Sequence, residues 1–277
     1  MITSTAIGRQ TVAFIGGGNM ASAIVGGLLR QGLSPGRIEV VEPFAEARAR
    51  LQSQFGVTAQ EHAGPALGRA QLVVWAVKPQ TFREAALQAR AHTATALHLS
   101  VAAGIRSESI AAWLGTQRIV RAMPNTPALI GKGMTALFAR AGVTADEKQV
   151  VEQLIGTTGQ SLWVELEQQL DAVTALSGSG PAYVFFFLEA MVRAGVEMGL
   201  SAQQARRLAV GTFAGASALA EATDDPLDLL RQRVTSRGGT TYAAIASMEQ
   251  DRVQDLFIEA MRAAGTRAAE LGDEFGA

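Results

Sequence analysis

Three small residues, Gly16, Gly18 and Ala21, have the spacing of a turn that binds a pyrophosphate. They follow a short apolar run, Val12–Ile15, and open a helical pattern rich in Ala and Gly. In such a turn the first glycine permits a tight bend, the second lets the backbone approach the phosphates, and the small third residue lets helix and strand pack. Free backbone N–H groups and the positive end of the helix dipole then attract the phosphates. The spacing predicts a dinucleotide site, and the alternative is a glycine turn without a ligand.

Three further segments lie where predicted strands end, which is the edge at which doubly wound sheets bind ligands. AVKPQ (76–80) contains Lys78, which either reaches a cofactor phosphate or ribose or is a solvated lysine. SVAAG (100–104) either offers small residues against which a cofactor can lie or forms an ordinary strand-to-helix turn. MPNTP (123–127) has prolines on both sides of Asn125, and prolines make a loop stiff and non-helical. Such a loop suits the positioning of a nicotinamide, and a plain turn at the domain edge is the alternative.

Glu42 closes the strand that follows the glycine turn, about 20 residues further along the chain. An acidic residue at that place can bind the hydroxyls of the adenosine ribose, and it would repel a 2′-phosphate. The same side chain could instead cap a helix that begins near Pro43. The sequence favours neither of these two interpretations over the other.

The segment VTSRGGTT (234–241) lies between two helical patterns in the second half of the chain. A glycine pair is flanked by hydroxyl side chains, and Thr240 and Thr241 open the second helix. Free N–H groups at such a helix start, together with the hydroxyl donors, would form an anion site of the size of a carboxylate. The alternative is an N-capped turn between helices, which sequence physics alone favours.

The predicted secondary structure that positions these residues changes near Trp163, from alternating strands and helices to helices alone. Up to about residue 160, strand patterns alternate with helix patterns, which predicts a mostly parallel sheet covered on both faces. The remainder reads almost entirely as helix, with breaks near SGSGP, Gly199, TDDP and SRGG. Strands are predicted at 11–16, 37–42, 71–77, 96–101, 118–122 and 133–139, and helices at 19–31, 44–54, 79–90, 106–114 and 144–156. The organisation is therefore an α/β nucleotide-binding domain, 1–163, followed by an all-helical domain, 164–277.

Length, composition and charge agree with this organisation. The chain has 277 residues, enough for about two domains, and 48% of them are hydrophobic. The net charge of −1 and the absence of a polybasic run argue against nucleic acid or an anionic membrane as partner. The longest apolar run, Ala182–Leu188, is shorter than a membrane-spanning helix, and the first residues, MITSTAIGRQ, lack the basic and apolar regions of a secretory signal. We therefore expect a cytoplasmic protein.

Several kinds of catalytic site are excluded by residue counts. The sequence has no cysteine, which excludes disulfides, thiolate nucleophiles and cysteine-based metal sites. Its histidines, His62, His92 and His98, lack the spacing of metal ligands, and we expect them to be solvated or capping residues. No metal site is predicted.

The motifs together resemble the pyrroline-5-carboxylate reductase family. FIGGGNMA, AVKPQ, SVAAG, RAMPNTPA, SGSGPAYVF and VTSRGGTT occur in the order and spacing of that family, from about residue 12 to residue 250. Their combination separates it from the related β-hydroxyacid dehydrogenases and imine reductases. The resemblance implies a Rossmann-type domain followed by an all-α dimerisation domain. It also implies reduction of L-1-pyrroline-5-carboxylate to L-proline by hydride from NADPH or NADH, which is the last step of proline biosynthesis.

The resemblance also implies a role for individual residues. Thr241 would hydrogen-bond the ring nitrogen of the substrate and is the catalytic candidate, while 177–183 would begin the helix against which the substrate packs. The substrate carboxylate would be held by Ser236, Gly239 and Thr240, and the cofactor would be bordered by Gly16, Gly18, Asn19, Met20, Glu42, Val77, Lys78, Ala102 and Asn125. Arg237 stands where the family often has proline or lysine, and it receives no role.

This chemistry agrees with the absence of an evident nucleophile or His/Asp pair. A protonated cyclic imine is already electrophilic, so catalysis rests on orientation of the reactants and on the chemistry of the cofactor. The alternatives are a related imine reductase or hydroxyacid dehydrogenase with another substrate, and a non-catalytic regulator that binds NAD(P)H. A hydroxyacid dehydrogenase usually needs a catalytic lysine in the helical domain to polarise the carbonyl of its substrate. No lysine follows Lys148 in this sequence, which argues against that alternative. The VTSRGGTT segment argues against a regulator, because a protein that only senses NAD(P)H needs no site for the carboxylate of an imino acid.

The helical half predicts self-association. AYVFFFLEAM (182–191) and TFAGASALA (212–220) carry apolar or small residues around much of the helix circumference. A helix that is apolar on most sides must be buried on most sides. We therefore expect a dimer or a ring of dimers rather than a monomer.

Overall fold

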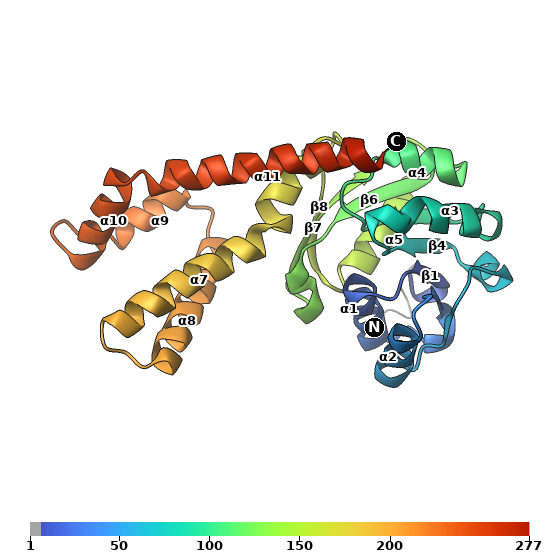
Figure 1. Cartoon of the computed structure of the whole chain (residues 1–277), viewed down its shortest axis with the longest axis horizontal. Coiled ribbons are helices and arrows are strands. Elements are labelled where there is room, and N and C mark those ends of the chain that lie inside the picture. Colours follow the sequence, from blue (N-terminus) through green and yellow to red (C-terminus); the bar gives the residue numbers. More distant parts are fainter. Residues whose placement is uncertain (1–6, 277) are drawn as a thin grey trace. The chain divides into compact units, whose positions relative to one another are not determined.

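The computed structural model describes residues 7–276 and divides the chain into two compact units. The first unit comprises the chain up to Ser179 together with the residues from Ala264 onward. The second unit is Gly180–Ala263 (Figure 1).

The first unit is built on one sheet of eight strands in the order β3-β2-β1-β4-β5-β6-β7-β8. Every neighbouring pair is parallel except β6 and β7, which are antiparallel. The strands are β1 Val12–Ile15, β2 Ile38–Val41, β3 Ala59–Gln60, β4 Leu72–Trp75, β5 Leu97–Ser100, β6 Ile119–Met123, β7 Gly133–Ala139 and β8 Gly159–Trp163. The Rossmann-type topology predicted for this part of the chain is confirmed, with β1 at the centre of the parallel part.

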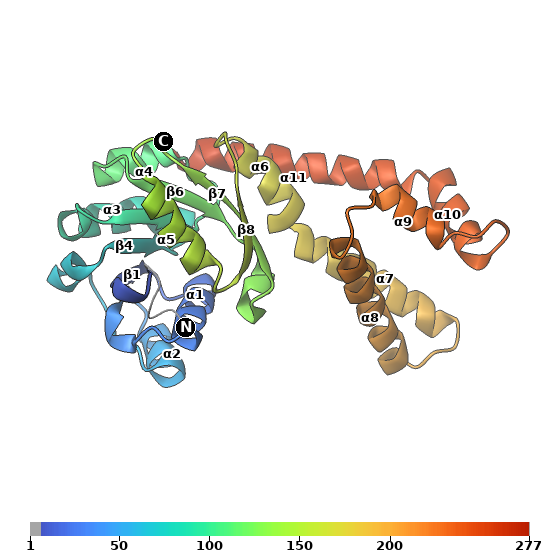
Figure 2. The ribbon, with the colours of Figure 1, turned by 180° about the vertical axis from the view of Figure 1, so that it is seen from behind.

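Helices cover both faces of this sheet, as Figure 2 shows from behind. Alternate strand residues such as Phe14 and Val74 pack with α1, α2 and α5, while Ala13 and Trp75 pack with α3 and α4. The helices are α1 Asn19–Arg30, α2 Ala45–Phe55, α3 Pro79–Thr93, α4 Ser107–Leu114, α5 Ala145–Ile155 and α6 Gln169–Val173, with short 3₁₀ turns at Ile7–Arg9, Pro35–Arg37, Pro65–Arg69 and Thr126–Ile130. Because strand side chains alternate between faces, the sheet has two separate cores.

Two edge strands were not predicted. β3 has only two residues, so no alternation of apolar and polar residues can be seen in it. β8 has the sequence GQSLW, and its residues are half-buried or exposed rather than alternating with the core. Both strands exist because a neighbouring strand offers them backbone partners, which is information that a local pattern does not contain. β8 ends at Trp163, the predicted end of the α/β part, whereas the two compact units divide between Ser179 and Gly180, and the residues from Ala264 onward return to the first unit.

The last helix, α11 (Val253–Phe275), runs from the second unit into the first. Arg106 holds its final turns by donating to the carbonyl of Ala269 at 3.4 Å and to the carboxylate of Asp273 at 3.5 Å, and it ties them to α6 by donating to the carboxylate of Asp171 at 3.0 Å. The hydroxyl of Ser109 donates to the carbonyl of Gly276 at 2.7 Å. The C-terminal turns are therefore part of the first unit.

The second unit is entirely helical. It contains α7 Gly180–Glu197, α8 Ala202–Glu221, α9 Leu227–Arg233, α10 Thr240–Gln250 and the first turns of α11. Small residues let α7 and α8 approach closely: a Cβ on Gly195 would lie 3.0 Å from that of Ala205. Large apolar side chains remain on the surface, among them Phe186, Leu208 and Leu219, which are 59–68% exposed. This unit therefore buries little of its own apolar surface.

One helical stretch within the described residues, Gln169–Glu197, is long and apolar enough to cross a membrane by length and composition alone. Its mean hydropathy is 1.3, and 6% of its most apolar window is buried. Apolar helices of protein interfaces have the same properties. Four charged residues, Asp171, Glu189, Arg193 and Glu197, lie on this stretch, and Arg193 and Glu197 form an ion pair at 3.6 Å.

Candidate functional site

The glycine turn after β1 has a backbone that only glycine can adopt at its first position. Gly16 has a φ of +96°, and a Cβ there would lie 2.6 Å from the carbonyl oxygen of Ala76. Its N–H donates to the carbonyl of Val41 at 2.8 Å, which ties the turn to the end of β2. The turn is therefore tight because it is packed between the ends of β2 and β4.

Helix α1 begins at this turn with an open N-terminus. Gly18 is the N-cap residue, no side chain caps the helix, and a Cβ on Gly18 would have nothing within 4 Å. The N–H groups of Asn19, Met20 and Ala21 lie in the first turn, where an α-helix provides no partners for them. This cradle of backbone donors beside open space fits the pyrophosphate of a dinucleotide.

The carboxylate of Glu42 is buried against the glycine turn. One oxygen, Oε2, accepts from the N–H of Gly17 at 2.7 Å, and Oε1 accepts from the N–H of Phe44 at 2.9 Å. Helix α2 begins at Ala45 and has Phe44 as its N-cap with no side-chain cap bond, so the interpretation of Glu42 as a helix cap is wrong. The position between β2 and the glycine turn is the one from which an acidic side chain can reach a ribose.

The guanidinium of Arg48 lies beside Glu42, but it is bound to other groups of the protein and does not neutralise the Glu42 carboxylate. Arg48 donates through Nη1 to the carbonyls of Glu42 and Pro43, at 3.0 and 2.7 Å. Its Nη2 donates to the carboxylate of Glu61 at 3.1 Å. All these partners belong to the protein, so the guanidinium is already engaged.

The remaining cofactor candidates follow three neighbouring strands of the sheet. Val77 and Lys78 follow β4, Ala102 follows β5, and Asn125 follows β6. Since these strands are parallel and adjacent, the four residues lie along the same edge as the glycine turn. Lys78 is exposed and is the N-cap of α3, whereas Ala102 is buried.

The candidate substrate residues lie in the second unit, in the loop between α9 and α10. Gly238 has a φ of +75°, and Gly239 is the N-cap of α10 without a side-chain cap. A Cβ on Gly239 would lie 2.7 Å from the hydroxyl oxygen of Ser236, so a larger residue there would force that hydroxyl to turn away. Thr240 and Thr241 are the first two residues of α10, and both are exposed. The N-capped alternative is not what the structure has, because the first-turn N–H groups of α10 are left without a side-chain cap.

The cofactor candidates and the substrate candidates thus form two groups. The first group shares one edge of the sheet in the first unit, and the second group occupies one loop and helix start in the second unit.

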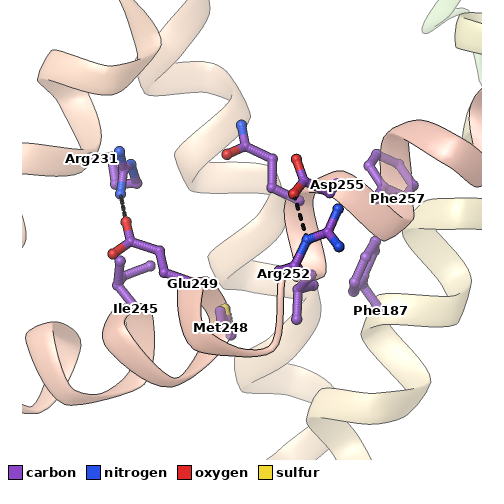
Figure 3. A pocket seen from close by; sticks show the side chains of 10 residues that line it. Phe187, Arg231, Ile245, Met248, Glu249, Arg252, Asp255 and Phe257 are labelled. Atoms are coloured by element: carbon purple, nitrogen blue, oxygen red, sulfur yellow. Dashed lines mark hydrogen bonds and ion pairs between the residues drawn. The ribbon is translucent and has the colours of Figure 1, made fainter.

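A separate hollow of about 410 Å³ lies at the other end of α10 (Figure 3). Phe187 and Phe257 form one wall, with ring centroids 5.5 Å apart. Two ion pairs border it, Arg231 with Glu249 at 3.1 Å and Arg252 with Asp255 at 3.0 Å. None of the residues that line it belongs to the VTSRGGTT loop, so this hollow is not the predicted substrate site.

His98 meets one of the two roles expected from the sequence. It is buried on β5, where its Nδ1 accepts from the indole N–H of Trp75 at 3.0 Å, so it is not solvated. Its side chain also hydrogen-bonds the backbone of Thr93, the last residue of α3, so the expected capping role is met. Burial lowers the pKa of His98 to about 4, because the charged imidazolium would lose its hydration. His62, by contrast, has a side chain that is 81% exposed. Among residues 7–276 no group of three or more His, Asp or Glu side chains could hold a metal ion.

Sequence reasoning gave no role to Gly17, the middle glycine of the turn. Its N–H holds the carboxylate of Glu42, and a Cβ there would lie 2.7 Å from Leu51 Cδ1. The run of three glycines was the available signal, since the G-x-G-x-x-A spacing itself needs only two of them.

Two family models match this chain. One is described as pyrroline-5-carboxylate reductase dimerisation and matches residues 167–271. The other is described as NADP oxidoreductase, coenzyme F420-dependent, and matches residues 11–104. The first covers the helical part of the chain and the second covers the glycine turn and the strands that follow it.

Individual relatives agree with these matches. The pyrroline-5-carboxylate reductase of Pseudomonas aeruginosa is 43% identical over 268 residues, which is 96% of this chain and 98% of the relative. A solved structure of that reductase from Coxiella burnetii has a TM-score of 0.88 at 38% identity and covers 95% of this chain and 98% of its own. The Plasmodium falciparum pyrroline carboxylate reductase, solved with NADP bound, has a TM-score of 0.85 at 25% identity, with the same coverage. The chain therefore belongs to the pyrroline-5-carboxylate reductase family.

Proposed function

We propose that this protein reduces L-1-pyrroline-5-carboxylate to L-proline with NADPH or NADH, the last step of proline biosynthesis. The observation that carries the proposal is the 43% identity to a pyrroline-5-carboxylate reductase over 96% of this chain. It is supported by the two groups of candidate residues, because one fits a dinucleotide and the other offers donors for a carboxylate.

The first group provides the nucleotide site. The N–H groups of Asn19 and Met20 bind the pyrophosphate at the N-terminus of α1, and Gly18 leaves the space for it. Lys78 adds a positive charge at the end of β4, and Glu42 contacts the adenosine ribose. Gly16, Val77 and Ala102 complete the lining toward the nicotinamide, and Asn125 lies near it through the backbone of its loop. When bound there, the nicotinamide supplies the hydride.

The second group provides the substrate site. Ser236 and Thr240 bind the carboxylate of the imino acid through hydroxyl groups and the free N–H groups at the start of α10. Gly239 lies between them, and its own N–H donates to the carbonyl of Ser236 at 3.0 Å, which closes the loop around the bound carboxylate. In this proposal the hydroxyl of Thr241, the next residue, lies beside the ring of the bound molecule. Thr241 donates a hydrogen bond to the ring nitrogen as it becomes an amine.

Catalysis by these residues is mainly a matter of orientation. A protonated imine carbon accepts a hydride without a strong acid beside it, so a weakly acidic hydroxyl such as that of Thr241 is sufficient. The carboxylate site fixes one face of the ring, and its distance from the imine carbon sets the length of molecule that is accepted.

Self-association is supported by the dimerisation model that matches 167–271. We propose that the exposed apolar side chains of α7 and α8, such as Phe186 and Leu208, are covered by a second copy of this chain. Several dimers then assemble into a ring. Protein rather than lipid covers the apolar stretch, because a lipid-facing helix would expose Glu189 and Arg193 at high cost.

The division of labour along the chain follows from these assignments. Residues 1–163 bind the nucleotide, and residues 164–277 bind the substrate and form the dimer. With a net charge of −1 the protein has no nucleic-acid partner, and it works in the cytoplasm.

The proposal is tested by following the nicotinamide absorbance with the purified protein and two candidate substrates. Pyrroline-5-carboxylate should oxidise NADPH or NADH, and the reverse reaction with a 2- or 3-hydroxy acid and NADP should give no signal. Oxidation of a hydroxy acid with no reduction of the imine would favour a dehydrogenase instead.

A further inference from the structure

Helix α7 begins with a missing hydrogen-bond donor. In an α-helix the N–H of each residue binds the carbonyl four positions earlier, so the N–H of residue 181 would bind the carbonyl of Ser177. Residue 181 is Pro181, the second residue of α7, and proline has no N–H. The carbonyl of Ser177 therefore needs a donor from elsewhere in the molecule.

The backbone around Ser177 is a π turn rather than an α-helix. Thr174–Gly178 has the wider geometry, and the N–H of Ser179 donates to the carbonyl of Thr174 at 2.8 Å. This turn lies just before the point where the chain leaves the first unit, and α7 starts at Gly180, in the second unit. Single π turns of this kind are frequent at functional sites.

Asn125 supplies the donor that proline lacks. Its Nδ2 donates to the carbonyl of Ser177 at 3.1 Å, and its Oδ1 accepts from the N–H of Met134, on β7, at 2.9 Å. Asn125 is also the N-cap of the 3₁₀ turn Thr126–Ile130, but its side chain makes no capping bond there. The amide is instead a bridge between β7 and the π turn.

A second contact holds the same turn to the end of β6. A Cβ on Gly178 would lie only 2.5 Å from Cε of Met123, the last residue of β6. Met123 therefore packs directly on the backbone of the turn. The turn is anchored by one polar and one apolar contact from the same loop, 123–125.

We propose that Asn125 is a positioning residue: by binding the carbonyl of Ser177 it fixes the π turn from which the substrate helix α7 begins. The inference rests on the proposed function, in which 177–183 begins the helix against which the substrate packs. It gives the amide of Asn125 a task that differs from direct contact with the nicotinamide. Loss of the bridge disturbs the imine site and leaves the nucleotide site intact.

The test combines two substitutions. Asn125→Ala removes the donor and should raise KM for the imine or lower kcat, with a combined loss in kcat/KM of about tenfold. The Kd for NADPH alone, measured by its fluorescence, should stay within about twofold of wild type. Pro181→Ala restores an N–H four residues after Ser177, so the double variant should recover most of the loss.

Asn125→Asp gives a second readout that a purely structural residue would not give. Above the pKa of the new carboxyl group, an anionic oxygen faces the carbonyl of Ser177 and repels it. Below that pKa the carboxyl group carries a proton and can donate, as the amide does. The ratio of kcat/KM for Asn125→Asp to that of wild type should therefore rise as the pH falls, while the ratio for Asn125→Ala stays flat.

Amide hydrogen exchange separates this proposal from the assignment of the reaction. In wild type the N–H of Met134 should be protected, and in Asn125→Ala it should exchange faster, whether or not the protein reduces the imine. Unchanged protection would overturn the bridge. An Asn125→Ala variant that weakens NADPH binding tenfold and is not rescued by Pro181→Ala would show that Asn125 binds the cofactor instead. If wild type does not reduce the imine at all, the proposed function fails while the exchange result still decides the bridge.

Discussion

At the scale of single residues, the carboxylate of Glu42 shows how the fold fixes a charge beside a ligand site. Two backbone N–H groups, from Gly17 and Phe44, hold its two oxygens, and the nearby Arg48 is engaged by other protein groups. Because both oxygens are held, the carboxylate keeps its orientation, and its negative charge repels any anionic group that is bound beside it.

Glu42→Ser should therefore change the choice of nucleotide. Removing the carboxylate relieves repulsion of the 2′-phosphate, so the ratio of kcat/KM for NADPH to that for NADH should rise by about tenfold. The matched control is Glu46→Ser, which removes an exposed carboxylate from the first turn of α2. The two ratios are measured in each variant. An unchanged ratio in Glu42→Ser would mean that its carboxylate does not face the ribose.

Thr241→Val tests the hydroxyl assigned to the ring nitrogen. Valine has nearly the same shape and no hydroxyl, so kcat/KM for the imine should fall by roughly one to two decades, the worth of a hydrogen bond to a charged group. Affinity for the nucleotide should not change, and Thr241→Ser should retain most of the activity. If the valine variant keeps full kcat/KM, Thr241 has no part in the reaction.

His98 predicts a pH dependence of stability. Its pKa is about 4 in the folded protein, against an ordinary value of 6.5, so the folded state favours the neutral form. The stabilisation is complete above pH 6.5 and is lost as the pH falls from 6.5 toward 4, with a total of about 3 kcal/mol.

The measurement for His98 is urea unfolding at pH 7 and pH 4.5 in wild type and in His98→Gln, whose amide can still accept from Trp75. The variant should lose less of its free energy of unfolding on acidification than wild type does. Equal losses in both proteins would assign the acid sensitivity to other groups.

At the scale of elements, the sequence predicts best where a pattern is local. The apolar runs of β1, β4 and β5 and the helix starts at Asn19 and Pro79 are found where they were predicted, because burial on both faces and capping act within a few residues. β8 and the π turn before α7 were not predicted, because both depend on partners far along the chain. Pro181 was correctly placed in the first turn of a helix, but its missing N–H is compensated by Asn125, which no local pattern could show.

The candidate site was likewise predicted only in part from the sequence. The glycine turn and the strand-end segments could be located from spacing, and parallel topology brings them to one edge. The contacts of Glu42 and Asn125 could not be located, since each side chain is oriented by a distant N–H or carbonyl group.

The start of α1 gives a prediction at this scale, through two glycines that differ in their surroundings. Gly16→Ala forces a positive φ on alanine and a collision with Ala76, so it should lower the free energy of unfolding by at least about 1–3 kcal/mol. Gly18→Ala has free space for its Cβ and a φ of −73°, so stability should stay near that of wild type. Its methyl group would project into the space left for the phosphates, and nucleotide affinity should fall. A Gly18→Ala variant with unchanged affinity would place the phosphates elsewhere.

At the scale of the whole molecule, the proposed function divides nucleotide binding and substrate binding between the two units. The first carries an edge of backbone donors and small residues suited to a dinucleotide, and the second carries a loop suited to a carboxylate. The second unit also keeps large apolar side chains on its surface, which the dimerisation match along 167–271 explains. A particle mass in solution of at least twice 29.0 kDa is expected, and a fully active monomer would contradict the proposed assembly.

The central claim is most directly tested by product analysis. The purified protein is incubated with pyrroline-5-carboxylate and NADPH, and in parallel with NADH, and L-proline is quantified by chiral chromatography against the nucleotide oxidised. The account predicts that one L-proline forms for each nucleotide oxidised, with at least one of the two nucleotides. A folded preparation that binds NADPH but forms no L-proline with either nucleotide would contradict it.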